Sequence, residues 1–141
     1  RAGVRVELNV RGICALRPGV SGVSENIRVV SNLGRFLEHS RIYHFERGGE
    51  SVCYMGSADL MPRNLDHRVE ILAPIEEPAL RARAVELIET CLADTSAAWE
   101  LQADGTWKRV PRPSSGGVNA QELLMERARR ATQAATGRTP R

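Results

Sequence analysis

The hydrophobic pattern changes between two neighbouring stretches, His67-Arg-Val-Glu-Ile-Leu72 and Glu76-Glu-Pro-Ala-Leu-Arg-Ala-Arg-Ala-Val-Glu-Leu-Ile-Glu-Thr-Cys91. The first stretch is short and rich in aliphatic residues, so it predicts a strand. In the second, apolar side chains recur at helical spacing, at Leu80, Ala84, Leu87, Ile88 and Cys91. Pro78 suits a first helical turn, and the acidic pair before it favours the positive end of a helix. We therefore predict a strand over 67–72 and a helix over about 77–93.

The rest of the chain predicts further strands, at residues 4–10, 27–30, 41–45, 51–55, 99–102 and 106–110. Arg47-Gly-Gly-Glu50 joins two of them into a hairpin, and Ala103-Asp-Gly105 joins the last two. A brief helix is predicted over 32–39, and a polar loop or irregular helix over 57–66. Strands separated by helices indicate an α/β fold with a mixed sheet flanked by helices.

The composition changes near residue 111. Residues 111–118 hold two Pro, two Ser and two Gly, which is typical of a linker. A basic helix is predicted from residue 119, fading into a disordered end over 136–141. We therefore expect a domain over 1–110, a linker over 111–118 and a helical, partly disordered tail over 119–141. Because the tail lacks a large apolar face, we expect the core to fold without the residues after 110.

The composition of the whole chain excludes several classes of protein. Its 141 residues are 42% hydrophobic and carry a net charge of +3, which suits one globular domain. No apolar run is long enough to span a membrane, and no N-terminal signal pattern is present. Cys14, Cys53 and Cys91 each sit in an apolar run, so we expect reduced core thiols in a cytoplasmic protein. Because the chain opens at Arg1 rather than Met, we expect a fragment of a longer protein.

His39-Ser-Arg41 is the densest cluster of chemically useful side chains. Side chains two apart on a strand share a face, so His39 and Arg41 can address one anion. The imidazole can exchange a proton near neutral pH, and the guanidinium can hold phosphate oxygens. The alternative is that His39 caps the end of a helix, where a cation is favoured. Arg63 and Arg68, among nearby acids, are expected to form internal ion pairs.

A second basic cluster is Arg11-Gly-Ile-Cys-Ala-Leu-Arg-Pro-Gly19. It leaves a predicted strand and presents Arg11 and Arg17 around a turn, at the kind of sheet edge where α/β folds bind ligands. The alternative is a pair of solvated arginines flanking a buried strand.

His39, Arg41, Glu46 and the pair Gly56-Ser57 resemble the H-x-K…D…G-S signature of the phospholipase D superfamily. The sequence departs from it by Arg41 in place of Lys, Glu46 in place of Asp and a longer gap before Gly56. Four stretches in order resemble the last domain of bacterial polyphosphate kinase, over residues 1 to about 110. They are Arg11-Gly-Ile-Cys-Ala-Leu-Arg-Pro-Gly19, Ser24-Glu-Asn-Ile-Arg28, Gly34-Arg-Phe-Leu-Glu-His-Ser-Arg-Ile-Tyr43 and Gly56-Ser-Ala-Asp-Leu-Met-Pro-Arg-Asn-Leu-Asp66.

The resemblance implies a phospholipase-D-like C-terminal catalytic domain with a basic helical tail. The parent enzyme would transfer the terminal phosphate of ATP reversibly to polyphosphate, through a phosphohistidine in a preceding domain. By analogy His39 is a supporting acid and Arg11 contacts nucleotide phosphate, while Arg17 and Arg41 would neutralise phosphates. The Mg²⁺ ligands would lie mainly in the preceding domain, so no metal ligand is assigned here.

The expected partners are ATP or ADP, inorganic polyphosphate, the remaining domains of the parent enzyme and further copies of it. The expected location is the cytoplasm or the inner face of its membrane. Two alternatives remain: a non-catalytic polyanion-binding module, and a phosphodiesterase half-site of the phospholipase D type. Specific nucleic-acid binding is not expected, because the chain has only six aromatic residues.

Overall fold

A computed structural model describes residues 2–137, and these divide into two compact units. The first unit combines Arg1–Leu37 with Thr90–Arg141, and the second is the continuous segment Glu38–Glu89. Helices and strands together place the chain in the α/β class, as the sequence predicts. The strands form two sheets, one in each unit, where a single mixed sheet was predicted.

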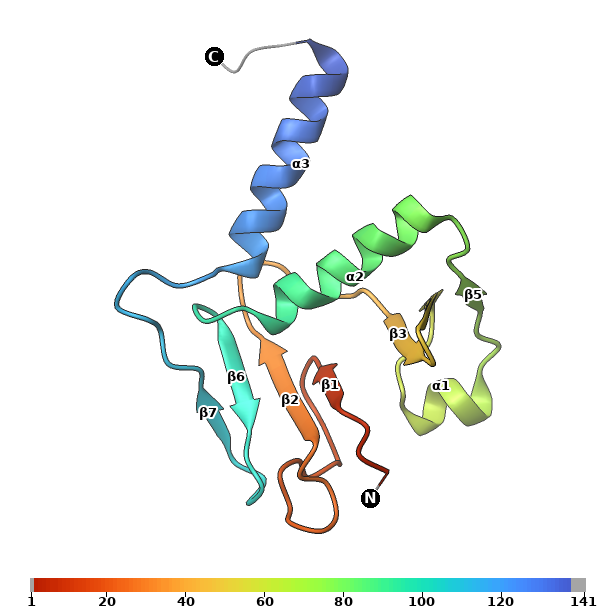
Figure 1. The fold of residues 1–141 in the computed structure, drawn as a ribbon, viewed down its shortest axis with the longest axis vertical. Helices are drawn as coiled ribbons and strands as arrows, with labels where there is room; N and C mark the ends of the chain where they lie inside the picture. Colours follow the sequence, from red (N-terminus) through yellow and green to blue (C-terminus); the bar gives the residue numbers. More distant parts are fainter. Residues whose placement is uncertain (1, 138–141) are drawn as a thin grey trace. The chain divides into compact units, whose positions relative to one another are not determined.

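The first unit is built on a four-stranded mixed sheet (Figure 1). Its strands are β1 (Val6–Asn9), β2 (Ile27–Asn32), β6 (Ala98–Leu101) and β7 (Trp107–Arg109), and their order is β1-β2-β6-β7. β1 pairs with β2 in parallel, whereas the other two pairings are antiparallel. Val29 and Val30 of the central strand β2 are fully buried. The core of this unit therefore lies on both faces of β2.

The predicted helix over 32–39 is wrong, because β2 extends through Asn32 and no helix follows before β3. The Asn32 side-chain amide donates to the Cys91 carbonyl at 2.8 Å, which fixes the strand end. Leu33 and Leu37 of the expected apolar stripe are exposed. A segment this short does not stay helical in water without burying a face.

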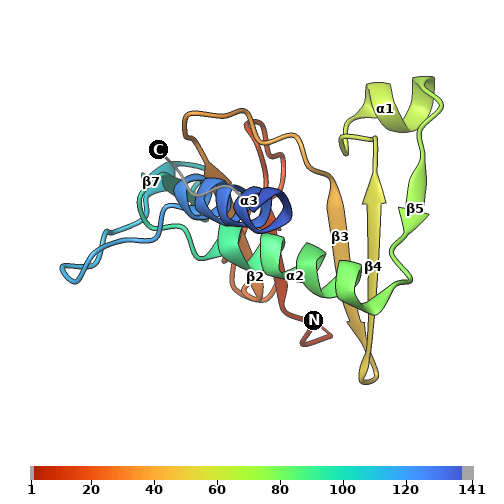
Figure 2. The same cartoon turned by 90° about the horizontal axis from the view of Figure 1, so that it is seen from above.

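The second unit carries the hairpin of β3 (Ile42–Arg47) and β4 (Glu50–Gly56), with β5 (Leu72–Pro74) added antiparallel to β4. Figure 2 shows these strands side by side. The hairpin confirms the sequence prediction, and Gly48 and Gly49 turn the chain at positive φ (58° and 89°).

The predicted strand over 67–72 is largely wrong. α1 (Pro62–His67) occupies its start, with proline at the head of the helix, and β5 begins only at Leu72. Val69 between them is 100% exposed. The apolar residues of this stretch therefore do not alternate between a buried and an exposed face, which is what a strand pattern implies.

The predicted helix near 77–93 is confirmed as α2 (Pro78–Leu92). The Glu77 carboxylate accepts a hydrogen bond from the Leu80 backbone N–H at 2.7 Å, so it satisfies one donor of the first turn. Ala84 and Cys91 are buried on its apolar face. The boundary between the two units falls within this helix, after Glu89.

The last helix, α3 (Ala120–Thr136), belongs to the first unit and is anchored there at its start. Ala120 is 1% exposed, and its backbone N–H donates to the Asp94 carboxylate at 2.7 Å. Of the predicted disordered end, Thr136 closes α3 and Gly137 caps it at φ 61°, whereas residues 138–141 lie outside the described residues. These contacts join the start of the predicted tail to the first unit.

The three cysteines occupy two kinds of environment. Cys53 and Cys91 are buried, as predicted, and burial raises the pKa of the Cys53 thiol. Cys14 is only half-buried and lies on the loop after β1, next to Ile13, which is 89% exposed. The prediction of a core thiol at Cys14 is therefore wrong. Within residues 2–137, no helix is both long and apolar enough to cross a membrane.

Candidate functional site

His39 and Arg41 meet where the chain enters β3. One terminal nitrogen of Arg41, Nη1, lies 2.9 Å from His39 Nδ1 and donates to the His39 carbonyl at 3.1 Å. Glu38 holds the same turn, because its carboxylate accepts from the Ser40 backbone N–H at 2.9 Å. The structure therefore brings the two predicted site residues together at the start of a strand. No helix ends at His39, so the helix-cap alternative is excluded.

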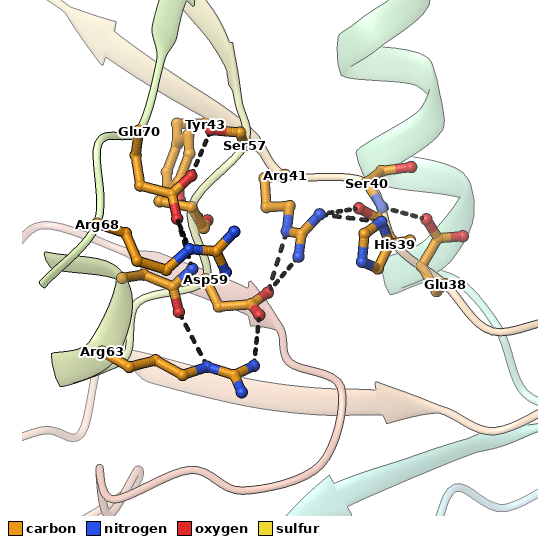
Figure 3. Close-up of polar contacts among 12 residues, drawn as sticks. Glu38, His39, Ser40, Arg41, Tyr43, Ser57, Asp59, Arg63, Arg68 and Glu70 are labelled. Atoms are coloured by element: carbon orange, nitrogen blue, oxygen red, sulfur yellow. Dashed lines mark hydrogen bonds and ion pairs between the residues drawn. The ribbon is translucent and has the colours of Figure 1, made fainter.

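Asp59 is the third member of this cluster (Figure 3). Its Oδ1 accepts from Arg41 Nε at 3.0 Å and from Arg41 Nη2 at 2.8 Å. The side chains of Arg41 and Asp59 are 16% and 24% exposed, so this ion pair is partly shielded from water. A pair with two donors on one carboxylate is geometrically more specific than a single contact at the surface.

The sequence pattern predicts Glu46, rather than Asp59, as the acid beside His39 and Arg41. Glu46 lies on β3 with its side chain 66% exposed, and its carboxylate is 3.0 Å from His44 Nε2. His44 Nε2 also lies 2.9 Å from Ser51 Oγ, so this histidine has a structural role on the hairpin. Asp59 lies two residues after the Gly56-Ser57 pair of the phospholipase D signature. This position is the sequence feature that could have identified Asp59 as the acid.

A polar network anchors the turn that carries Asp59. Ser57 Oγ donates to the Glu70 carboxylate at 2.5 Å and accepts from the Ile71 N–H at 3.0 Å. The buried Asn64 donates to the other Glu70 oxygen at 2.7 Å. Hydrogen bonds from Ser57 and then Asn64 hold the pKa of Glu70 below its ordinary value, with a smaller contribution from nearby arginines.

Arg63 and Arg68 form the internal ion pairs that the sequence predicts. Arg63 Nη2 lies 3.7 Å from Asp59 Oδ2, and Arg68 Nε lies 3.5 Å from Glu70 Oε1. Both arginine side chains are more than half exposed, so these pairs contribute little to the free energy of unfolding.

Arg11 and Arg17 lie in the first unit, on the long connection between β1 and β2. The connection is tied at both ends: Val10 N–H donates to the Val30 carbonyl at 2.8 Å, and Ser24 Oγ donates to the Arg17 carbonyl at 2.6 Å. Gly12 turns the chain at φ 90° beside Arg11. Of the four residues predicted to contact phosphate, Arg11 and Arg17 thus lie on this connection. The other two, His39 and Arg41, lie in the second unit.

The described part of the chain contains no group of three or more His, Cys, Asp or Glu side chains that fits a metal ion. Asp59 and Glu70, the acids of the cluster, already accept hydrogen bonds from arginine, serine and asparagine. These residues do not fit a resident metal site.

Comparison with known proteins gives a consistent result. A family model described as polyphosphate kinase C-terminal domain 2 matches residues 1–121. The polyphosphate kinase 1 of Chlorobaculum tepidum is 54% identical over 127 residues, which are 90% of this chain and 18% of that protein. The polyphosphate kinase of Streptomyces coelicolor is 51% identical over 138 residues, 96% of this chain and 18% of the relative.

A crystal structure of polyphosphate kinase from Porphyromonas gingivalis has a similar fold, with a TM-score of 0.84 and 34% sequence identity. The similarity covers 95% of this chain and 20% of that one. The chain therefore spans about a fifth or less of the length of the relatives it matches.

Proposed function

Because the chain belongs to the polyphosphate kinase C-terminal domain 2 family, we propose that it supplies one part of a phosphoryl-transfer site. The parent enzyme would move the terminal phosphate of ATP reversibly onto polyphosphate. Residues 1–110 would act as a phospholipase-D-like catalytic domain, joined through 111–118 to a basic helical tail over 119–141. The parent enzyme would lie in the cytoplasm or at the inner face of its membrane, as an assembly of several copies.

The observation that carries this proposal is the contact between His39 and Arg41 beside a partly shielded Asp59. Phosphoryl transfer depends mainly on positioning and on positive charge around the moving group, and both are available here. His39 would support the leaving diphosphate, either by stabilising it or by protonating it. Arg11 would contact nucleotide phosphate, and Arg17 and Arg41 would neutralise further phosphate charge.

The remaining parts of the reaction would come from elsewhere in the parent enzyme. The phosphorylated histidine and the main Mg²⁺ ligands would lie in a preceding domain, as the resemblance to polyphosphate kinases implies. The chain alone would therefore bind polyphosphate without turning over ATP.

The test is His39→Ala in the full-length enzyme that contains this chain. Turnover of ATP with polyphosphate should fall about a hundredfold or more, the scale expected for loss of either an acid catalyst or a hydrogen-bond donor to the developing charge. The melting temperature should change little, because the His39 side chain is exposed. His67→Ala is the matched control, since His67 is also exposed but ends α1 outside the Arg41 cluster. A normally active His39→Ala enzyme would refute the site assignment.

A further inference from the structure

Arg41 holds two different side chains at the same time (Figure 3). Its Nε and Nη2 donate to Asp59 Oδ1, and its Nη1 lies 2.9 Å from His39 Nδ1. A guanidinium keeps all its protons at physiological pH and has only donors to offer. His39 Nδ1 must therefore be the acceptor in this contact.

An accepting Nδ1 defines the state of the imidazole ring. In a neutral imidazole one ring nitrogen accepts and the other carries the proton, so the proton of His39 sits on Nε2. A doubly protonated ring would turn an N–H toward the Arg41 N–H and set two positive charges against each other. The contact therefore favours neutral His39 with an Nε2–H.

Asp59 is what keeps Arg41 in this orientation. With Nε and Nη2 both bound to Oδ1, the plane of the guanidinium is fixed and only Nη1 faces His39. The position of Asp59 is fixed in turn, because the Ser57 and Glu70 network anchors its turn and its backbone carbonyl accepts from the Met61 N–H at 2.8 Å. As in a catalytic triad, a carboxylate helps to set the tautomer of a histidine, but here it acts through Arg41, and the proton stays on Nε2 rather than on Nδ1.

We propose that Asp59 is a positioning residue that acts through Arg41 to fix His39 as the neutral Nε2–H tautomer. His39 then contacts a phosphate oxygen as a hydrogen-bond donor and keeps its proton, rather than transferring it as an acid. The phosphate contact rests on the function proposed above, whereas the tautomer is a property of this chain alone. Of the two roles open to His39, this geometry favours stabilising the leaving diphosphate.

The tautomer can be measured by ¹⁵N NMR on the 141-residue chain with labelled histidine. The His39 signals are assigned by their loss in His39→Gln, which separates them from those of His44 and His67. At neutral pH we expect Nε2 to carry the proton and Nδ1 to carry none. Asp59→Asn and Arg41→Lys should shift the ring toward a mixture of tautomers, and Asp59→Glu should restore part of the original pattern.

Asp104→Asn is the matched control for a purely structural effect. The Asp104 carboxylate accepts from the Thr106 N–H at 2.9 Å and from Thr106 Oγ1 at 2.7 Å, in a turn of the first unit. This variant should leave the His39 signals unchanged. A proton on Nδ1 in the unaltered chain, or an unchanged pattern in Asp59→Asn, would overturn the proposal.

Kinetics on the full-length enzyme give the second measurement. Asp59→Asn should lower kcat by about tenfold or more, as loss of an orienting partner typically does, with little change in KM for ATP. Asp59→Glu should recover part of kcat. Normal turnover in Asp59→Asn despite an altered tautomer would overturn this proposal, whereas normal turnover in His39→Ala would overturn the proposed function instead.

Discussion

Glu70 shows how a single carboxylate stabilises the loop that carries Asp59. One of its oxygens accepts from Ser57 and the other from Asn64, so it joins the turn after β4 to α1. These hydrogen bonds favour the ionised form, which is why the pKa of Glu70 is lowered. The geometry of the site therefore depends on Glu70, although neither of these hydrogen bonds joins Glu70 to His39 or Arg41.

We expect the stability of the chain to fall in acid partly through Glu70. Its pKa is depressed in the folded chain relative to its ordinary value, so its contribution is present above the pKa of the unfolded chain. The contribution is lost as the pH falls through the folded pKa, because the unfolded chain binds the proton first. Denaturant unfolding between pH 7 and pH 3 should therefore show a weaker pH dependence for Glu70→Gln.

Glu50→Gln is the matched control for this measurement. Glu50 is an exposed hairpin carboxylate, 3.3 Å from Arg47, and its variant should follow the pH dependence of the unaltered chain. A Glu70→Gln curve parallel to that of the unaltered chain would show that the carboxylate does not contribute.

At the level of residues, the sequence predicted His39 and Arg41 as neighbours but missed Asp59. The prediction assumed strand spacing, whereas both residues precede β3 and are joined by the contacts of Arg41 Nη1 with the His39 ring and carbonyl. The Arg41–Asp59 pair joins positions 18 residues apart across a hairpin and a turn. Several acids lie within that range, and only the folded chain shows which one Arg41 reaches.

Among the elements, α3 has a larger role than its sequence indicates. The Asp94 carboxylate, 1% exposed, accepts from the backbone N–H groups of Ser96, Ala97 and Ala120. The side chain of Gln121 makes two hydrogen bonds to the backbone of Phe36. It accepts from the Phe36 N–H at 3.0 Å and donates to the Phe36 carbonyl at 2.7 Å. The start of α3 is thus part of the polar interior of the first unit.

Truncation after Val110 should therefore destabilise the chain, contrary to the expectation from the sequence. Removing α3 takes away the Ala120 N–H, one of the hydrogen-bond donors to the buried Asp94 carboxylate. Asp94→Ala should cost about 2–3 kcal/mol of unfolding free energy, because buried N–H groups lose their acceptor. A chain ending after Thr132 is the control and should melt near the temperature of the full chain, since it keeps these contacts. An unchanged melting temperature after truncation at Val110 would show that α3 is dispensable.

The sequence predicted the elements that are marked by long apolar periodicity or by turn and cap residues. It did not predict the conformation of segments that lack these features. α2 has a long apolar period and proline in its first turn, and the β3–β4 hairpin has paired glycines, so both were predicted near their observed bounds. The stretch 32–39 has three apolar residues at helical spacing and still forms no helix. Its conformation is decided by distant partners, the Cys91 carbonyl and Gln121.

For the whole chain, we expect weak polyphosphate binding that falls steeply with salt. The net charge is +3, and residues 1–70 carry ten arginines against eight acids. Arginine contacts to a polyanion release counterions, so the logarithm of the binding constant should fall linearly with the logarithm of salt concentration. Titration of labelled polyphosphate at several salt concentrations measures this slope.

Matched arginine variants locate the binding face. Arg11→Ala and Arg17→Ala should each reduce the salt slope by roughly one if they contact phosphate. Arg129→Ala, on the exposed side of α3, should leave the slope unchanged. Equal effects of all three variants would indicate a diffuse charge effect rather than a phosphate-binding face.

The division into a continuous unit and an interrupted one has a consequence for synthesis on the ribosome. The strand partners of β3, β4 and β5 all lie within Glu38–Glu89 and emerge together, whereas β2 must wait for β6, because Val30 pairs with Glu100. Before β6 is synthesised, one edge of β2 has no hydrogen-bonding partner strand. Val29 and Val30, which are fully buried in the folded chain, are then not yet fully covered. Nascent chains stalled between these residues would expose an aggregation-prone strand, so this interval is where a chaperone would have the most to protect.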